Sequence, residues 1–453
     1  MKKLRLIIAI IACKAAIVAG NLLGKEASSA PGALALKICP DILKILSSQV
    51  KGDIVAVCGT NGKTTTNNLL YSFLTENGYK VVSNNYGANM LPGVCCAFAK
   101  SATIFGKINA DFACLEIDEA STVRVFEKMT PDKMIITNLF RDQLDRYGEI
   151  SQTAALLKKA LSHAPKTELI LNADDPYVSH FGTEAGRKCY YISAIENTSS
   201  NAESDKNVLC PLCGEKLSYD YHHYSQLGKY HCPSCSFKRA DADFKICDVS
   251  VSDNLIFTLN YGDKNYSFDV GYKGFYNIYN ISTAFSVALL LIGNVSNYEK
   301  ILSSYKPQIG RMEEFNIGKK LILNMSKNPA GFNQGIAAIM ADNRTKDIAI
   351  AVNDAPSDGT DISWLWDVKF ENLLSCNIGK IYVSGSRADD VMVRLKYSGF
   401  ETERFSKADS LKDSCHKLRK GTGEALYYLS NYTATFALHD ILKNMEKETK
   451  HEL

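Results

Sequence analysis

The residues with the clearest capacity for chemistry follow a short apolar run, Asp53 to Cys58, and precede a stretch with helical spacing. Glycines at such a turn let backbone N–H groups close on phosphate oxygens, and the start of a helix favours negative charge. Lys63 would neutralise the β- and γ-phosphates, and the Thr64 hydroxyl would bind Mg²⁺. Only two residues separate the glycines, so a simple Gly/Asn turn is the alternative interpretation. The predicted triphosphate loop comprises Gly59, Thr60, Asn61, Gly62, Lys63, Thr64 and Thr65.

A carboxylate stands near the end of a second apolar run, at residues 112–117. Mg²⁺ binds oxygen ligands and bridges phosphates to one or two carboxylates. Glu116 is therefore a candidate magnesium ligand beside the phosphate loop, because strand ends of a parallel sheet meet at one edge. Asp118 and Glu119 are explained equally well as surface residues at a strand end.

Four cysteines form two CxxC pairs separated by 18 residues. Four thiolates at this spacing close the tetrahedral shell of Zn²⁺ and leave no position for water or substrate. We therefore expect a structural zinc site, with a redox dithiol or an iron–sulfur cluster as the alternative. The nearby His222, His223 and His231 are interpreted as surface or packing residues. The predicted zinc ligands are Cys210, Cys213, Cys232 and Cys235.

The elements that must position these groups alternate between apolar strands and helical stretches, which predicts parallel sheets covered by helices. A chain of 453 residues is expected to form two or three domains. A polar stretch near 197–207 leads into the cysteine insert, and a boundary is predicted near 307–311. Strands are predicted at 53–58, 112–117, 134–137, 168–172, 254–261, 348–352, 380–384 and 425–429, and helices at 42–50 and 279–292.

Composition narrows the class of protein. The formal net charge is +3, with 46% hydrophobic and 22% charged residues, as in ordinary globular proteins. A nucleic-acid-binding protein would concentrate basic residues on one face, so no nucleic-acid partner is expected. Fourteen cysteines, only four of them clustered, suit a reducing cytoplasm better than a disulfide framework.

The N-terminal segment is apolar from Leu4 to Leu23, after Lys2 and Lys3. Lys14 leaves only eight uninterrupted apolar residues, whereas a spanning helix needs roughly 20. We expect an uncleaved helix that lies on the enzyme or on the membrane face, with a true anchor as the alternative; secretion is not expected. A chain break is predicted at residues 30–32, which read Ala-Pro-Gly.

The loop sequence Gly-Thr-Asn-Gly-Lys-Thr-Thr resembles the ATP loop of the Mur ligases and folylpolyglutamate synthetases. Further motifs resemble the same family, in the same order, over nearly the whole chain from about residue 50. They are Leu115 to Glu119, Thr137-Asn138, Asp142 to Asp145 with Gly148, Asn172 to Pro176, and Gly310 to Glu313.

The cysteine insert narrows the resemblance, because most Mur ligases lack it. It is similar to the ribbon of the MurT family, the synthetase subunits of lipid II isoglutaminyl synthases. Gln143 stands where many Mur ligases carry a histidine, a departure shared with that family. Other segments that resemble MurT proteins are Asn84 to Met90, Phe140 to Glu149, Asn328 to Gly331, Val352 to Asp354, Asp358 to Asp361 and Ser363 to Asp367.

The resemblance implies an α/β fold with a Mur-ligase-type central parallel-sheet ATPase domain. That domain carries a four-cysteine zinc-ribbon insert and is followed by a smaller α/β C-terminal domain. The expected organisation is an N-terminal helical segment (1–48), the central ATP-binding domain (49–306) with the insert (205–245), and the C-terminal ligase domain (307–453).

The resemblance also implies the reaction. ATP, with Mg²⁺, would activate the α-carboxyl group of D-glutamate in the lipid II stem peptide as an acyl phosphate, and ammonia would convert it to D-isoglutamine. No cysteine here has the strand–helix turn and histidine of a glutaminase nucleophile. The ammonia would therefore come from a partner glutaminase of the GatD type, in a heterodimer at the inner face of the cell membrane.

Three further residues take roles from the resemblance. Asn277 matches a family asparagine near the adenine and ribose, and Arg311 matches an arginine that reaches the nucleotide. Asp354 matches an aspartate that orients the histidine of the glutaminase. The alternatives are a helix N-cap for Asn277 and a solvated loop for Asp354. Asp358 and Asp361 are interpreted as solvated loop residues.

Two other functions are compatible with parts of the pattern. One is a stand-alone Mur-type ligase that adds an amino acid to a UDP-muropeptide. The other is a zinc-ribbon scaffold that binds ATP without chemistry. Lys63 and Glu116, which with Asp354 form the predicted catalytic set, disfavour the scaffold.

Overall fold

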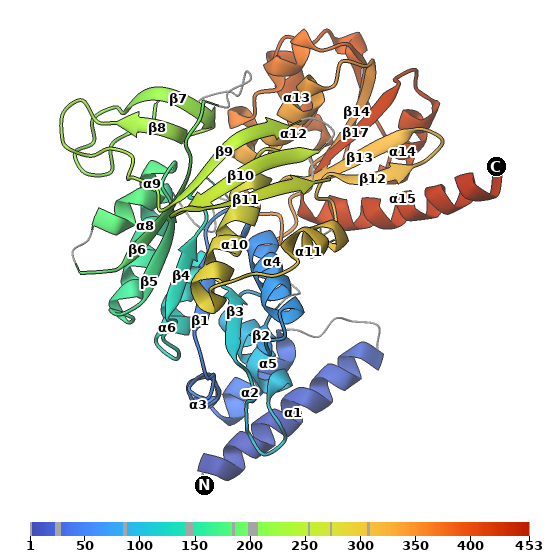
Figure 1. Ribbon diagram of the computed structural model, residues 1–453. Coiled ribbons are helices and arrows are strands. Elements are labelled where there is room, and N and C mark those ends of the chain that lie inside the picture. The colour runs from blue at the N-terminus through green and yellow to red at the C-terminus, as the bar shows by residue number, and fades with distance from the viewer. Residues whose placement is uncertain are drawn as a thin grey trace. The chain divides into compact units, whose positions relative to one another are not determined.

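The computed structural model describes residues 2–22, 29–84, 88–141, 149–183, 186–197, 207–251, 254–271, 274–305 and 309–452. The chain divides into two compact units (Figure 1). The first unit contains residues 1–139, 150–271 and 275–305, and the second contains residues 140–149, 272–274 and 306–453. The N-terminal helical segment belongs to the first unit.

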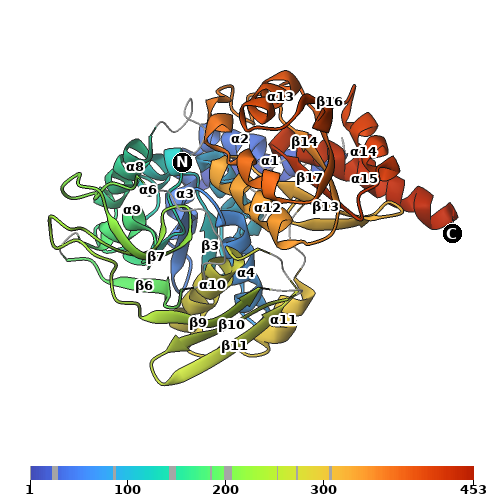
Figure 2. The same cartoon turned by 90° about the horizontal axis from the view of Figure 1, so that it is seen from above.

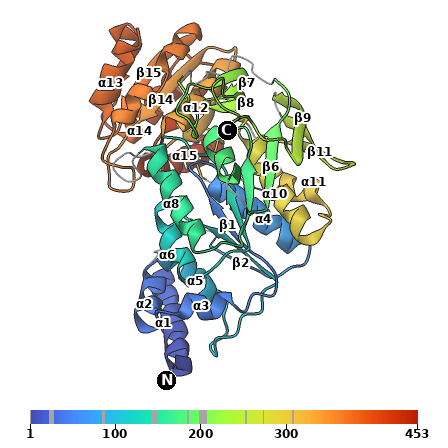
Figure 3. The same cartoon turned by 90° about the vertical axis from the view of Figure 1, so that its left-hand side faces the viewer.

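The first unit is built on a nine-stranded sheet in the order β11-β10-β9-β6-β5-β4-β1-β3-β2. The strands from β2 to β9 in this order pair in parallel, and β9, β10 and β11 pair antiparallel. Strand β1 (Ile54–Cys58) is buried at every residue, as expected for a strand covered on both faces. Figure 3 shows α6 and α8 on one side of this sheet and α4 and α10 on the other.

The helices of this unit are α1 (Lys2–Leu22), α2 (Ala30–Ile38), α3 (Ile42–Ser47), α4 (Lys63–Glu76), α5 (Leu91–Ser101), α6 (Thr122–Phe126), α8 (Ile150–Ser162), α9 (Pro176–Ser179), α10 (Asn277–Ile292) and α11 (Tyr298–Ser304). Its remaining sheet strands are β2 (Val81–Ser83), β3 (Phe112–Glu116), β4 (Lys133–Ile136), β5 (Glu168–Asn172), β6 (Cys189–Ala194), β9 (Phe244–Val251), β10 (Leu255–Tyr261) and β11 (Lys264–Val270).

The cysteine insert forms a separate antiparallel hairpin, β7 (Ser218–Tyr224) with β8 (Leu227–His231). It lies in the chain between β6 and β9, which pair with each other in parallel. Figure 2 shows the hairpin beside β6 in the first unit. Its small core consists of Val208, Cys210, Leu217, Tyr230, Cys232 and Phe237.

The second unit has a six-stranded sheet in the order β12-β13-β17-β14-β15-β16, parallel except for the β12–β13 pair. Its strands are β12 (Glu313–Asn316), β13 (Lys320–Met325), β14 (Lys346–Ala351), β15 (Ile378–Ser384), β16 (Phe405–Lys407) and β17 (Ala425–Ser430). Its helices are α12 (Pro329–Ala341), α13 (Ala388–Tyr397), α14 (Leu411–Lys420) and α15 (Tyr432–Glu452).

The expected α/β class with a central parallel sheet is confirmed, and each predicted strand begins and ends within two residues of an observed one. The predicted chain break at residues 30–32 is wrong, because α2 begins at Ala30. Pro31 occupies the first turn of that helix, where its missing N–H removes no helical hydrogen bond. Gly32 lies so close to α5 that a Cβ there would be 1.8 Å from the Pro92 carbonyl oxygen.

Candidate functional site

The predicted phosphate loop leaves the centre of the first sheet. Strand β1 pairs with β3 on one side and β4 on the other, so the chain leaves β1 at a point where the strand order reverses. Ligands of open α/β sheets bind outside the carboxyl ends of strands at such points. The loop 59–62 occupies this position and leads directly into α4.

Two glycines give the loop its shape. Gly59 has φ +116° and Gly62 has φ +85°, values that side-chain-bearing residues rarely adopt. A Cβ at Gly62 would also lie 2.2 Å from the Asn280 side-chain oxygen. Helix α4 begins at Lys63, and the first N–H groups of a helix have no partner within it. The chain therefore presents a helix start at the carboxyl edge of the sheet, and Gly62 leaves the room there that the Asn280 side chain occupies.

The end of β4 holds the loop in place. The Thr60 N–H donates to the Asn138 carbonyl oxygen at 2.8 Å, and the Asn61 N–H donates to the Asn138 side-chain oxygen at 2.8 Å. The Thr137 hydroxyl donates to the Asn61 carbonyl at 2.8 Å. These bonds fix the loop through the protein alone, which is the pre-organisation that phosphate binding requires.

Lys63 is held by an acidic residue that the sequence left unassigned. Its Nζ lies 2.9 Å from Glu119 Oε1 and donates to the Gly59 carbonyl at 2.5 Å. The same Glu119 oxygen accepts the Gly59 N–H at 2.8 Å. Burial alone would lower the pKa of Lys63, but the Glu119 and Glu116 carboxylates outweigh it and raise this pKa. The lysine is therefore positively charged in the loop.

The interpretation of Asp118 and Glu119 as surface residues is wrong, since both are 3% exposed. Burial raises the pKa of Glu119, and the ion pair with Lys63 opposes this. Asp118 precedes the short 3₁₀ turn at Glu119–Ser121 and accepts the Ala120 N–H at 3.1 Å.

Glu116 is the last residue of β3 and lies in register beside Val57 of β1. Its backbone is clamped by Asn84, which accepts its N–H at 2.9 Å and donates to its carbonyl at 2.7 Å. Asn89 donates to Glu116 Oε1 at 2.9 Å. The other oxygen, Oε2, is buried and has no hydrogen-bond partner.

This orphaned oxygen is the test of the predicted magnesium site. An unpaired buried carboxylate oxygen is costly, and a hard cation is the ligand that offsets the cost. The Thr66 hydroxyl at the start of α4 is also buried without a partner. The side chains of Thr64 and Thr65 are half-buried in the same turn. The oxygen donors fit Mg²⁺. Asn84 and Asn89 belong to the segment Asn84 to Met90, which resembles MurT proteins but for which the sequence suggested no function.

Asn277 is the first residue of α10 and is buried. The cap position of this helix is Tyr276, so the N-cap alternative does not apply to Asn277. Asn280 donates to the Asn277 side-chain oxygen at 3.1 Å, and its own oxygen faces Gly62. The predicted adenine-side residue is thus linked through Asn280 to the phosphate loop.

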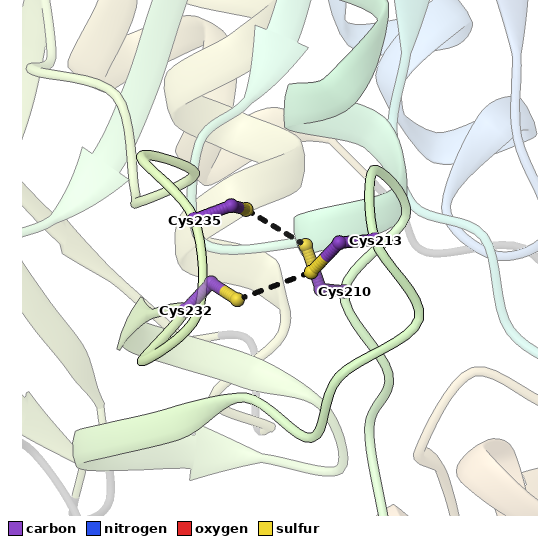
Figure 4. Close-up of side chains that lie close together, drawn as sticks. All are labelled: Cys210, Cys213, Cys232 and Cys235. Carbon is purple, nitrogen blue, oxygen red and sulfur yellow. Dashed lines mark hydrogen bonds between the residues drawn. The ribbon is translucent and has the colours of Figure 1, made fainter.

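The four predicted zinc ligands converge. Figure 4 shows Cys210 and Cys213 from one loop facing Cys232 and Cys235 from another. All four sulfurs lie within 4.8 Å of one another. The Cys210–Cys235 sulfurs are 3.7 Å apart and the Cys213–Cys232 sulfurs 3.5 Å, against about 3.8 Å for a tetrahedral Zn²⁺ with 2.3 Å bonds. The residues fit zinc.

The turn of the ribbon hairpin reaches the sheet through Gln226. This side chain is 3% exposed and donates to the Leu139 carbonyl at 2.8 Å. Leu139 directly follows Asn138, which holds the phosphate loop. Asp175 accepts the Leu139 N–H at 2.8 Å and lies 3.4 Å from the Gln226 amide nitrogen. A short path of contacts therefore connects the ribbon to the loop.

Asp174 anchors the base of the ribbon and is fully buried. It accepts hydrogen bonds from the Arg239 guanidinium at 3.0 Å, the Tyr279 hydroxyl at 2.7 Å and the Ser193 hydroxyl at 2.7 Å. His223, predicted as a surface or packing residue, packs here with a fully buried ring. Burial lowers its pKa, so the ring is neutral at pH 7.

Asp354 lies in the second unit, just after β14. Its carboxylate accepts from the Ser386 hydroxyl at 2.7 Å and from Arg387 Nε at 2.8 Å. The Ser386 hydrogen bond and then Arg387 lower its pKa. The Asp354 side chain is about one-third exposed and ionised, and its two hydrogen bonds fix its orientation. Its carboxylate oxygens can still accept a hydrogen bond from a donor on another protein.

The prediction that Asp358 is a solvated loop residue is wrong. It is 4% exposed and accepts the Thr433 N–H at 2.8 Å in the first turn of α15. Asp361 accepts the Ser363 N–H at 2.8 Å, as a turn residue would.

Arg311, the predicted nucleotide-binding arginine, lies in the second unit, and its Nε is buried without a hydrogen bond. Gln143 lies outside the described residues.

Comparison with known proteins identifies the family and the fold of this chain. The Mur ligase middle domain family matches residues 57–288, and the MurT ligase C-terminal family matches residues 325–435. The lipid II isoglutaminyl synthase (glutamine-hydrolyzing) subunit MurT of Staphylococcus aureus strain COL is 38% identical over 406 residues, covering 89% of this chain and 90% of that protein.

This chain belongs to the MurT family of Mur ligases. The MurT subunit of Streptococcus pneumoniae strain ATCC BAA-255 / R6 is 32% identical over 431 residues, covering 92% and 93% of the two chains. A pseudomurein peptide ligase type C from Methanothermus fervidus has the same fold, with a TM-score of 0.72 at 22% identity and coverage of 88% and 80%. The MurT relatives are named as subunits, so members of this family work in a complex.

Proposed function

We propose that this MurT-family chain amidates a carboxyl group with ATP and ammonia. The substrate is lipid II, and the reacting group is the α-carboxyl of D-glutamate in its stem peptide, which becomes D-isoglutamine. The names of the curated relatives support this substrate. The observation that carries the proposal is Glu116 Oε2, a buried carboxylate oxygen without a partner beside a pre-formed phosphate loop.

The chemistry needs activation because a carboxylate does not react with ammonia at neutral pH. A carboxylate oxygen attacks the γ-phosphorus of ATP and ADP leaves, giving an acyl phosphate. Ammonia then attacks the acyl carbon, and inorganic phosphate leaves with the C–O bond electrons. Phosphoryl transfer of this kind depends on positioning and charge stabilisation, which the chain supplies through Lys63 and the first N–H groups of α4.

The residues around the loop have separate tasks. Glu119 holds the Lys63 ammonium at the loop until a triphosphate offers stronger acceptors. Glu116 and Thr64 would hold Mg²⁺, which neutralises charge on the β- and γ-phosphates when bound. Asn277 and Arg311 would bind the nucleoside end.

Ammonia must come from another protein. A glutaminase needs a reactive thiolate, and the candidate thiols here are buried. Burial raises the pKa of Cys95 to about 12, and that of Cys58 well above the ordinary thiol value. A hydrogen bond from Cys13 lowers the pKa of Cys96, but this thiol is 6% exposed and out of reach of a glutamine substrate. We therefore assign glutamine hydrolysis to a partner glutaminase of the GatD type. Asp354 would orient its histidine, as a triad aspartate does. The complex would work in the cytoplasm, at the inner face of the membrane that holds lipid II.

The test is reconstitution of the chain with its glutaminase and lipid II. Amidation should require ATP together with either glutamine or added ammonium. Glu116→Ala should abolish amidation from both nitrogen sources, and full activity of this variant would overturn the assignment. If the chain alone joined an amino acid to a UDP-muropeptide, the stand-alone ligase would be the correct function.

Asp354→Asn separates the two halves of the reaction. It should abolish amidation from glutamine and leave amidation from ammonium unchanged, because the ligase site is intact. Asp361→Asn, at another loop aspartate of the same unit, is the matched control and should leave both activities unchanged. Equal loss of both activities in Asp354→Asn would contradict the interface role.

A further inference from the structure

Helix α1 carries two apolar faces, of which the first unit covers one. Leu6, Ala9, Ile10 and Cys13 are buried against the protein. Gly106, between α5 and β3, packs on this face so closely that a Cβ there would be 2.7 Å from a Leu6 methyl carbon. These contacts hold the first half of α1 on the surface of the unit (Figure 3).

The opposite face of α1 is apolar and exposed. Leu4 is 62% exposed, and Ile8, Ile11 and Val18 are between 46% and 58% exposed. Their spacing of four, three and seven residues keeps them on one side of a helix, with Leu22 continuing the line at 83%. A contiguous exposed apolar face of this kind marks a binding surface.

A second element adds to this face. The turn from Thr103 to Gly106 places Ile104 and Phe105 at its tip, with exposed fractions of 50% and 66%. Because Gly106 contacts Leu6 and Ile10, this tip lies beside the N-terminal half of α1. Two segments far apart in the sequence thus expose apolar side chains next to each other. We call them the α1 face: Leu4, Ile8, Ile11, Val18, Ile104 and Phe105.

The charges on the two segments that form the α1 face are of one sign. Neither α1 nor the stretch 88–110 contains an acidic residue. The basic residues in these two segments are Lys2, Lys3, Arg5, Lys14, Lys100 and Lys107. An apolar helix face flanked by lysine and arginine binds the interface of an anionic bilayer, where the apolar side chains enter the acyl boundary and the cations meet the head groups.

We propose that the α1 face docks the enzyme on an anionic phospholipid bilayer, with α1 lying in the plane of the membrane. A spanning helix would have to leave the unit and expose Leu6, Ile10 and Cys13, which now pack in its core. The proposal deepens the proposed function, because a lipid-linked substrate stays at the membrane. It does not depend on that function for its test, since docking needs neither nucleotide nor glutaminase.

The experiment is sedimentation of the full chain with vesicles of phosphatidylglycerol and phosphatidylcholine, compared with phosphatidylcholine alone. The chain should bind the anionic vesicles and be released by high salt or alkaline carbonate. The double variant Ile8→Ser/Ile11→Ser should bind at least about tenfold more weakly. The matched control is Val251→Ser/Ile256→Ser, which removes exposed apolar side chains from β9 and β10.

The outcomes separate the alternatives. Equal vesicle binding by the two double variants overturns the docking face. Resistance of the bound chain to alkaline carbonate overturns the in-plane position. If the chain ignores vesicles and Ile8→Ser/Ile11→Ser converts a dimer to a monomer in sedimentation equilibrium, the α1 face joins two copies and the proposal is wrong. Loss of amidation with normal vesicle binding would count against the proposed function alone.

Discussion

The phosphate loop and the cysteine ribbon are both short motifs, but they obtain their shapes in different ways. The loop is fixed by the surrounding protein: Asn138, Thr137 and Glu119 bind its backbone, and a buried Glu116 oxygen is left for a cation. The ribbon has two strands and a core of six buried residues. A two-stranded hairpin is marginal by itself, so zinc at the four cysteines would contribute to its shape.

This difference between the two motifs separates a ligand that would stabilise the fold, zinc, from ligands that would take part in the reaction, ATP and Mg²⁺. Zinc would contribute to the folding of residues 207–242, whereas ATP and Mg²⁺ would enter a site that already has its geometry. The path through Gln226 and Leu139 connects the two regions. Variants that act on only one of them therefore test the comparison.

The largest effect is expected at the loop. Lys63→Ala should reduce amidation about 10³-fold, the order seen when one transition-state donor is removed. It also leaves Glu119 buried without its counter-charge, which costs about 3 kcal/mol or more. The double variant Lys63→Ala/Glu119→Gln removes that charge. It should regain thermal stability and stay inactive; if it regained activity, Lys63 would have only a structural role.

The next largest effect is expected at the ribbon. Cys210→Ser should lose bound zinc, open residues 207–242 to proteolysis and lower the Tm by roughly 5 °C or more. Because the loop is held by other contacts, Mg-ATP binding measured by calorimetry should persist, although weakened. Cys376→Ser in the second unit is the control. Full zinc content in Cys210→Ser would contradict the four-thiolate site.

A smaller effect is expected where the two regions meet. Gln226→Ala leaves the Leu139 carbonyl without its side-chain donor, a loss of about 1–3 kcal/mol. The expected result is unchanged zinc content with ATP affinity lowered roughly three- to tenfold, because strain at Leu139 reaches the loop through Asn138. Lys229→Ala, exposed on the same hairpin, should change neither quantity. Normal ATP affinity in Gln226→Ala would mean that the ribbon and the loop are energetically independent.

The smallest effect is a pH dependence at the same contact. Burial raises the pKa of Asp175 to about 7 against its backbone hydrogen bonds. A carboxyl group with a raised folded pKa contributes stability below its unfolded pKa of about 4, and this is lost as pH rises through 7. Between pH 5 and 8 the free energy of unfolding of the wild type should fall by on the order of 2 kcal/mol more than that of Asp175→Asn, which is measured as a steeper fall of the Tm. Parallel Tm profiles would assign the slope to other groups.

Much of the fold was predictable because its signals are local. Buried parallel strands give apolar runs, and the glycines of the loop mark its turn without any tertiary information. The break predicted at Pro31 was wrong because proline is common both after the end of a helix and in its first turn. The sequence does not decide between the two, whereas the close packing of Gly32 on α5 accompanies a helix here.

The site was predictable only in part, because its supporting contacts cross long distances in sequence. Glu119 meets Lys63 across 56 residues, and Gln226 meets Leu139 across 87. Nothing in the local pattern distinguishes these buried acids and amides from solvated ones. Asp358 shows the same limit, since it binds α15 from 75 residues away.

The place of the ribbon in the sheet has a consequence for engineering. Strands β6 and β9 run in parallel and overlap by three residues, with Ile192 beside Phe244 and Ala194 beside Ile246, so the chain that leaves Ala194 must come back by this overlap before it enters Phe244. The ribbon makes this return and takes the place that a helix has in most parallel pairs. Parallel strands cannot be joined by a two-residue turn, so a redesign that removes the ribbon must supply another longer connection between Ala194 and Phe244.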